Sequence, residues 1–144
     1  MSPLSREKEQ QLIARFLPIE DVQERLALIV DRARRFAPLT DSERCETNRV
    51  QGCSSRVWIA ASHESGICHF RLDADSTLVK GLAGLLCEIY DGTAAGDIAA
   101  TEPTILESLH LIDHLSPTRR HGLEQVRRVI REFALAATAD TAPR

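Results

Sequence analysis

The sequence predicts an α+β fold in which a small antiparallel β-sheet of about three strands packs against several α-helices. Two short segments, near residues 55–62 and 68–73, carry the β-branched and alternating apolar residues of strands and lie close enough to form a hairpin. Apolar residues recur at helical spacing on both sides of this pair. We therefore expect a single domain over residues 1–144, with an ordered core from about residue 5 to residue 137.

Two helices are expected before the hairpin. Residues 5–16 and residues 21–36 each place apolar side chains along one side of a helix. Asp21 is an N-cap for the second helix, which should end before Pro38. Residues 37–49 are polar and aperiodic, which predicts a long connection of the kind that is usually functional or mobile.

The hairpin should bury one face, because Cys68, Phe70 and Leu72 alternate with polar residues along its second strand. Residues 63–66 contain a glycine and predict a four-residue connection between the two strands. Residues 50–51 are candidates for a short third strand ahead of the first one.

A buried central helix is expected over residues 77–90. Ser76 is a good N-cap, and apolar side chains surround almost the whole circumference of the segment that follows. Gly81 and Gly84 are costly inside a helix, so they should be there to let another backbone come close.

The last third of the chain predicts further helices. A short helix capped by Thr93 and a segment after Pro103 should precede a long helix that begins at Ser116 and Pro117. The Ala/Thr-rich residues 136–144 at its end should fray. Three arginines are expected on the solvent side of this helix: Arg127, Arg128 and Arg131.

Composition and charge argue against several functional classes. A formal net charge of −3 and an aromatic content of 4% give neither a basic field nor stacking platforms for nucleic acid. No apolar run approaches the roughly 20 residues that span a bilayer, and the N-terminus lacks the apolar core of a signal peptide. We therefore expect a cytoplasmic protein whose four cysteines are thiols.

Cys53 is the candidate reactive residue. It lies between Gly52, which tolerates a positive φ, and two serines that favour a turn, directly before the strand residues Val57-Trp58-Ile59. Cys68 and Cys87 instead face buried sides and should be packing residues, and Cys45 should be a tolerated surface thiol.

A nucleophilic thiol must be accessible and must ionise, so nearby cations are candidate helpers of Cys53. Lys80 is the only cation on the central helix, and Arg56, Arg119 and His121 could also approach the thiol. Each also has an ordinary interpretation, since Lys80 could extend to solvent and Arg119 could be a solvated residue at the start of a helix.

Two other functional classes stay open at this point. A metal or iron–sulfur cluster scaffold would need several converging ligands, but no cysteine pair has C-x2-C spacing. We therefore expect no metal site. A thiol enzyme could use His63, His69 or His121 as a base, although no local pattern connects any of them to Cys53.

The residues around Cys53 also carry a family resemblance. The run Glu46-x-Asn48-Arg49-Val50-x-Gly52-Cys53-x-Ser55-x-Val57-Trp58 is followed, in order, by Asp75-Ser76, Val79-Lys80-Gly81-Leu82, Tyr90-Asp91-Gly92 and Leu115-Ser116-Pro117-Thr118-Arg119-x-x-Gly122-Leu123. These segments resemble the SufE sulfur-acceptor proteins, which include the CsdE branch, from about residue 20 to residue 134. One departure is Ser54, where the family usually has glutamine, a difference that bears on the rigidity of the loop.

The resemblance implies a fold and a function. The fold would be the α+β fold shared with IscU/NifU-type scaffold proteins. Cys53 would accept persulfide sulfur from a PLP-dependent cysteine desulfurase of the SufS or CsdA type, stimulate that enzyme, and pass the sulfur to an iron–sulfur scaffold of the SufBCD type or to another acceptor. The chain would be a stoichiometric partner rather than an enzyme and would need no cofactor, since the PLP belongs to the desulfurase. A homodimer is left open.

The resemblance assigns the persulfide to Cys53 and supporting positions to five further residues: Gly52, Ser55, Trp58, Lys80 and Arg119. A persulfide on an exposed loop would be lost to solvent reductants. We therefore expect Cys53 to alternate between a pocket beside Trp58 and the buried helix, and an extended pose at the partner.

Overall fold

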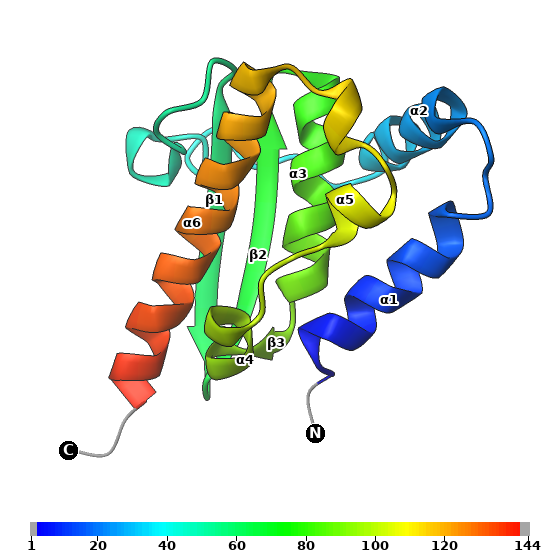
Figure 1. The fold of residues 1–144 in the computed structure, drawn as a ribbon. Coiled ribbons are helices and arrows are strands. Elements are labelled where there is room, and N and C mark those ends of the chain that lie inside the picture. The colour runs from blue at the N-terminus through cyan, green and yellow to red at the C-terminus, as the bar shows by residue number, and fades with distance from the viewer. Residues whose placement is uncertain (1–2, 142–144) are drawn as a thin grey trace.

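The computed structural model describes residues 3–141 and is α+β, as expected (Figure 1). Its elements follow the order α1 (Ser5–Phe16), α2 (Val22–Ala33), the 3-10 helix η1 (Glu46–Asn48), β1 (Val57–Glu64), β2 (Ile67–Ala74), α3 (Thr77–Tyr90), β3 (Thr93–Ala94), α4 (Ala95–Ala100), α5 (Ile105–Ser108), the 3-10 helix η2 (Ile112–His114) and α6 (Pro117–Thr141). None of the helices in this part of the chain is long and apolar enough to cross a membrane.

The sheet has three antiparallel strands in the order β1-β2-β3. Glu64 pairs with Ile67, so the hairpin turn contains only two residues instead of the expected four. Ser65 and Gly66 have φ values of 54° and 81°, the left-handed pair that matches the twist of the flanking strands. The second strand is therefore longer than the sequence pattern predicted, and the first lies two residues later along the chain.

The third strand lies at Thr93–Ala94, where we expected a helix cap, and not at residues 50–51. Gly92, with a φ of 75°, turns the chain after α3 so that Thr93 pairs with Cys68 on β2. The hydroxyl of Thr93 donates to the carbonyl of Tyr90 instead of capping α4. Near residues 50–51 the contact with β1 is limited to an isolated bridge and the bond from Val50 N to Val57 O.

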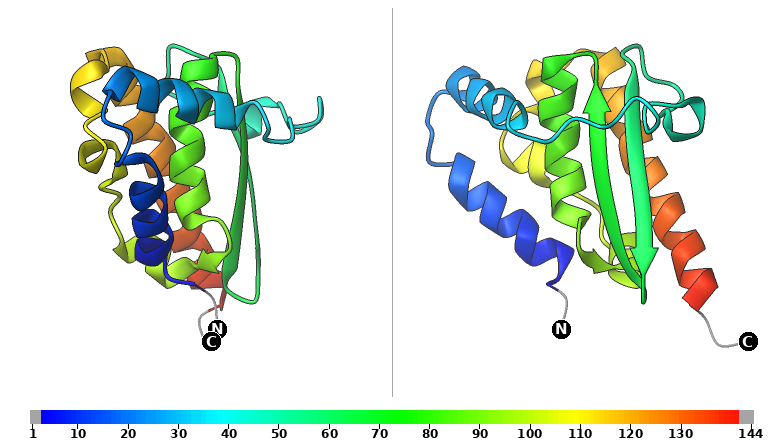
Figure 2. Two further views of the ribbon diagram at one scale, coloured as in Figure 1. Left: turned by 90° about the vertical axis from the view of Figure 1, so that its right-hand side faces the viewer. Right: turned by 180° about the vertical axis from the view of Figure 1, so that it is seen from behind.

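Helices α3 and α6 cover one face of the sheet, with α1, α4 and α5 outside them (Figures 1 and 2). Helix α3 is buried along most of its length, as its apolar circumference predicted. A Cβ atom on Gly81 would lie 3.1 Å from the Cα of Val30 on α2, and one on Gly84 would lie 2.7 Å from a ring carbon of Phe36. Gly81 therefore lets the backbone of α2 come close, as expected, whereas Gly84 makes room for the side chain of Phe36 and not for a backbone.

Arg127 corrects the expectation for α6, because it is 8% exposed instead of lying on the solvent side. Its guanidinium stacks 4.7 Å from the ring centre of Tyr90 and donates to the carbonyl oxygens of Ile98 and Thr101. Helix α4 and the segment after it pack over this side of α6 and cover the arginine. Helix α6 also continues to Thr141, so the first part of the segment expected to fray is helical, and residues 142–144 lie outside the described chain.

The connection between α2 and β1 crosses the opposite face of the sheet (Figure 2). Asp73 holds it there by accepting hydrogen bonds from Leu39 N at 3.2 Å and from Arg44 Nη1 at 3.1 Å. Arg71 on β2 forms an ion pair with Glu43. These contacts fix the direction in which the chain enters the turn that carries Cys53.

The start of β1 and the N-terminal ends of α3 and α6 lie at one end of the molecule, opposite the hairpin turn (Figure 1). The long connection therefore delivers the Cys53 turn to a place where two helices begin. This arrangement positions the candidate site.

Candidate functional site

The turn before β1 has the conformation that the glycine predicted. Gly52 has a φ of 84°, a region that residues with a Cβ atom rarely adopt. A Cβ atom at this position would also lie 3.2 Å from Cγ of Gln125 and 3.4 Å from Nε2 of His121, both on α6. Gly52 thus allows the turn to pack directly against α6.

Cys53 lies half-buried in a small hollow between the N-terminal turns of α3 and α6. Its thiol donates a hydrogen bond to the carbonyl oxygen of Gly122, with an Sγ–O distance of 3.4 Å. The lining residues come from the turn and from both helices: Cys53, Ser54, Ser55, Val79, Thr118, Arg119, Gly122 and Leu123.

Gly122 makes room for the thiol. It is buried in α6, and a Cβ atom there would lie 3.4 Å from the sulfur of Cys53 and 3.9 Å from its Cβ. Glycine is unfavourable inside a helix, so a position like this usually has a packing reason. That cost was the available sequence signal for Gly122, which sequence reasoning did not single out as a site residue.

Burial raises the pKa of the Cys53 thiol above its ordinary value, and the nearby charge of Arg49 opposes this shift only in part. The N-terminal ends of α3 and α6 also favour a thiolate, since the positive ends of helix dipoles stabilise negative charge. Burial outweighs the Arg49 charge, so the thiol ionises less readily and is a weaker nucleophile in this pose than a fully exposed cysteine.

Some of the residues expected to support Cys53 lie beside it in the structure, and others do not. Ser55 and Arg119 line the hollow, and His121 packs against Gly52. Lys80 instead forms an ion pair with Asp73, with an Nζ–Oδ1 distance of 3.5 Å.

The second wall of the hollow also differs from the expected one. Trp58 is absent from the lining residues and pairs with Asp73 on the neighbouring strand, on the face of the sheet away from α3 and α6. One side of the hollow is formed by the buried helix α3, as expected. The other side is formed by α6, where we expected Trp58. The sequence could not show this, because α6 begins more than 60 residues after Cys53.

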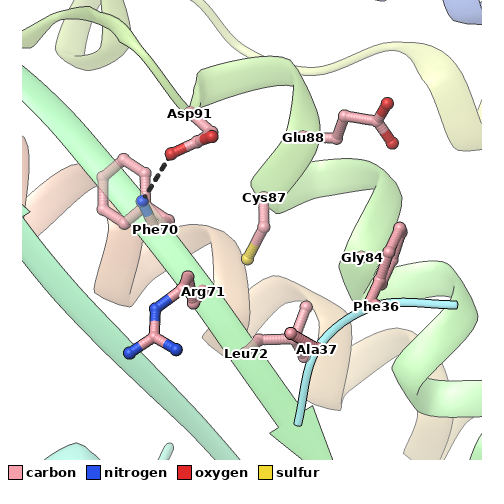
Figure 3. Close-up of a pocket in the computed structure, with 9 residues that line it drawn as sticks. All are labelled: Phe36, Ala37, Phe70, Arg71, Leu72, Gly84, Cys87, Glu88 and Asp91. Carbon is pink, nitrogen blue, oxygen red and sulfur yellow. Dashed lines mark hydrogen bonds between the residues drawn. The ribbon is translucent and has the colours of Figure 1, made fainter. Parts of the chain in front are cut away.

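Two of the other cysteines are packing residues, as predicted. Cys68 and Cys87 are buried, and Cys87 projects from α3 toward β2 at the edge of a separate cavity of about 220 Å³ (Figure 3). Burial, with a smaller contribution from the charge of Asp91, raises the pKa of Cys87 to about 12. Cys87 is therefore a protonated, unreactive thiol.

Metal ligands do not converge within residues 3–141. No group of three or more histidine, cysteine, aspartate or glutamate side chains there could hold a metal ion. The cysteines described above are dispersed over the turn, the sheet and α3, which is not the arrangement that a cluster scaffold uses.

Comparison with known proteins identifies the family. A family model described as SufE, an Fe-S metabolism associated domain, matches residues 10–134. The chain belongs to the SufE family. This membership associates the chain with iron–sulfur metabolism, in agreement with the resemblance noted for the sequence.

A solved structure supports the fold of this SufE-family chain. The solution structure of a hypothetical protein from Thermus thermophilus superposes with a TM-score of 0.75 at 22% sequence identity. The match covers 92% of this chain and 96% of the other. At this identity the similarity establishes a shared fold.

Proposed function

We propose that this SufE-family chain takes persulfide sulfur from a PLP-dependent cysteine desulfurase onto Cys53, stimulates that enzyme, and passes the sulfur to iron–sulfur cluster assembly. The observation that carries the proposal is the place of Cys53 on a glycine turn, half-buried in a hollow at the end of the molecule. Cys68 and Cys87, in contrast, are sealed in the interior.

The chemical step needs only a thiolate and a partner persulfide. The Cys53 thiolate attacks the outer sulfur of the partner's persulfide, and an S–S bond forms at Cys53 Sγ. The partner's own S–S bond breaks, and its cysteine leaves as a thiolate that can take up a proton. No external oxidant, metal or cofactor is consumed.

Two poses of the turn fit this chemistry. In the retracted pose the thiol donates to the carbonyl oxygen of Gly122, and burial raises its pKa and so disfavours the thiolate. In an extended pose it would leave the hollow, lose the burial that raises its pKa, and reach into the partner's site. A partner that favours the extended pose activates the nucleophile by moving it, without supplying a base.

The proposal makes the chain a stoichiometric partner of the desulfurase. The thiol is regenerated only when a downstream acceptor removes the sulfur. Faster removal of sulfur from the desulfurase would free its cysteine for the next turnover, which accounts for stimulation without a catalytic site on this chain.

Intact mass spectrometry tests the proposal directly. The protein is incubated with a purified cysteine desulfurase of the SufS or CsdA type and free cysteine, then measured with and without dithiothreitol. We expect a mass gain of one sulfur atom that maps to Cys53 and disappears on reduction. A gain located on Cys45, or no gain while the desulfurase turns over, would contradict the assignment.

A further inference from the structure

The hollow around the resting thiol is almost full. With Cys53 in place, the centre of a water-sized sphere has only about 10 Å³ in which to lie among the lining residues. That is about the smallest space that holds one water molecule. A sulfur atom is larger than the oxygen of a water molecule, so a persulfide would need room that the hollow lacks.

A second sulfur atom cannot lie along the line from Cys53 Sγ to the carbonyl oxygen of Gly122, where the thiol proton points. The sulfur of Cys53 lies 3.4 Å from the carbonyl oxygen of Gly122. An S–S bond of about 2.05 Å along this line would end about 1.4 Å from that oxygen, far inside van der Waals contact. The carbonyl oxygen would also repel the negative charge of a persulfide.

The walls leave little freedom to turn the outer sulfur elsewhere within the hollow. Leu123 and Val79 are buried side chains of α6 and α3, 4% and 9% exposed, and both line the hollow. Interiors packed in this way resist the insertion of even one extra heavy atom. The remaining outlet for a second sulfur atom is toward solvent, out of the hollow.

We propose that Gly122 is a positioning residue whose hollow accepts the Cys53 thiol and excludes the Cys53 persulfide, so that loading with sulfur holds residues 50–56 in the extended pose. This inference rests on the proposed function. It favours transfer of sulfur onward to the next protein, because the empty thiol retracts into the hollow whereas the loaded persulfide stays exposed. The hollow therefore shelters the empty thiol rather than the sulfur cargo.

Hydrogen–deuterium exchange of residues 50–56 tests the proposal without a desulfurase. The persulfide is installed with inorganic polysulfide in a Cys45→Ser background: the Cys53 thiolate takes one sulfur atom and a shortened polysulfide leaves. We expect faster exchange in the persulfide form than in the thiol form, and a return to the slow rate after dithiothreitol. Equal exchange in the two forms would overturn the proposal.

A pair of wall variants makes the test specific. Gly122→Ala brings a methyl group to van der Waals distance, 3.4 Å, from the resting sulfur, so its thiol form should exchange faster than the wild-type thiol form. Alanine is favoured over glycine in a helix by roughly 1 kcal/mol, so this variant should not unfold α6. Val79→Ala enlarges the hollow, so its persulfide form should regain part of the slow exchange of the thiol form.

Gly96→Ala is the matched control, because Gly96 is also a helix glycine but a Cβ atom there meets nothing within 4 Å. Its exchange at residues 50–56 should equal that of the wild type. A Gly122→Ala variant that behaves like this control would contradict the proposal.

The outcomes separate this inference from the proposed function. A chain that changes exchange after polysulfide treatment but takes no sulfur from any desulfurase would keep the positioning role and lose the proposed function. A chain that accepts sulfur from a desulfurase but shows no change in hydrogen–deuterium exchange would keep the proposed function and lose the positioning role of Gly122.

Discussion

The thiol of Cys53 donates a hydrogen bond to the carbonyl oxygen of Gly122, 69 residues further along the chain. This contact fastens the turn before β1 to the first turns of α6. It joins the half-buried cysteine of the glycine turn to a helix position where a Cβ atom would lie 3.4 Å from the sulfur. The retracted pose of the thiol depends on this pair.

Replacing Cys53 with serine should abolish stimulation of the desulfurase. Serine keeps nearly the same size but cannot form a persulfide, so docking should survive while sulfur acceptance is lost. Sulfide and alanine release from cysteine measure the stimulation, and Cys45→Ser is the control, expected to stimulate like the wild type. Full stimulation by Cys53→Ser would remove the thiol from the mechanism.

Alkylation of Cys53 by iodoacetamide should be slower than that of a free cysteine at neutral pH and should rise with pH, because burial raises the pKa of the thiol. The Arg49 charge opposes this shift, so Arg49→Gln should raise the pKa further and slow alkylation at fixed pH. Mass spectrometry of samples quenched at successive times gives the rate. An unchanged profile in Arg49→Gln, matching the Arg56→Gln control, would show that the Arg49 charge does not reach the thiol.

Replacing Arg127 with methionine should lower the free energy of unfolding by about 2–4 kcal/mol. The change removes the stack on Tyr90 and the donors to Ile98 and Thr101 in a covered site. Arg128→Met is the control, because Arg128 is exposed and its loss should cost less than about 0.5 kcal/mol. Urea unfolding measures both, and equal losses would refute the buried role of Arg127.

The Cys87 thiol should make the fold less stable in alkaline solution. Its pKa is raised to about 12 in the folded protein, whereas the pKa of a cysteine in an unfolded chain is about 8.5. The contribution of this group is fully present below the unfolded pKa and falls by about 1.4 kcal/mol per pH unit above it, until the folded pKa is reached.

The variant Cys87→Ala tests this pH dependence. Although it should be less stable than the wild type at neutral pH because of the cavity, its free energy of unfolding should fall less steeply between about pH 8 and pH 10. Urea unfolding at several pH values gives the two slopes. Parallel slopes would mean that Cys87 ionises as easily in the folded chain as in the unfolded one.

Local signals predicted much of the fold. Asp21 and Ser76 cap their helices as expected, accepting from Gln23 N at 2.9 Å and from Val79 N at 3.3 Å. Gly81 lies against the backbone of α2, as its cost in a helix suggested, although Gly84 faces a side chain instead. Each of these inferences uses residues within one or two turns of one another, where backbone geometry restricts the outcome.

Packing between distant segments was harder to predict. The periodicity of α6 predicted that Arg127 faces solvent, but helix α4 packs over that side of α6 and buries it. The third strand formed at Thr93 because a turn at Gly92 brought it beside Cys68. The residues that neighbour Arg127 and Thr93 in the sequence predict neither outcome, because each depends on how two distant elements pack together.

By itself the sequence determined the α+β class, the hairpin, the glycine turn and the cysteine it carries, because these follow from local periodicity and from backbone conformations that few residues can adopt. Only the tertiary structure decided what surrounds that cysteine: α6 instead of Trp58, Gly122 as hydrogen-bond acceptor, and Lys80 paired with Asp73. The reason is physical, since the size of the hollow and the pKa of its thiol come from atoms that the chain brings together only when it folds.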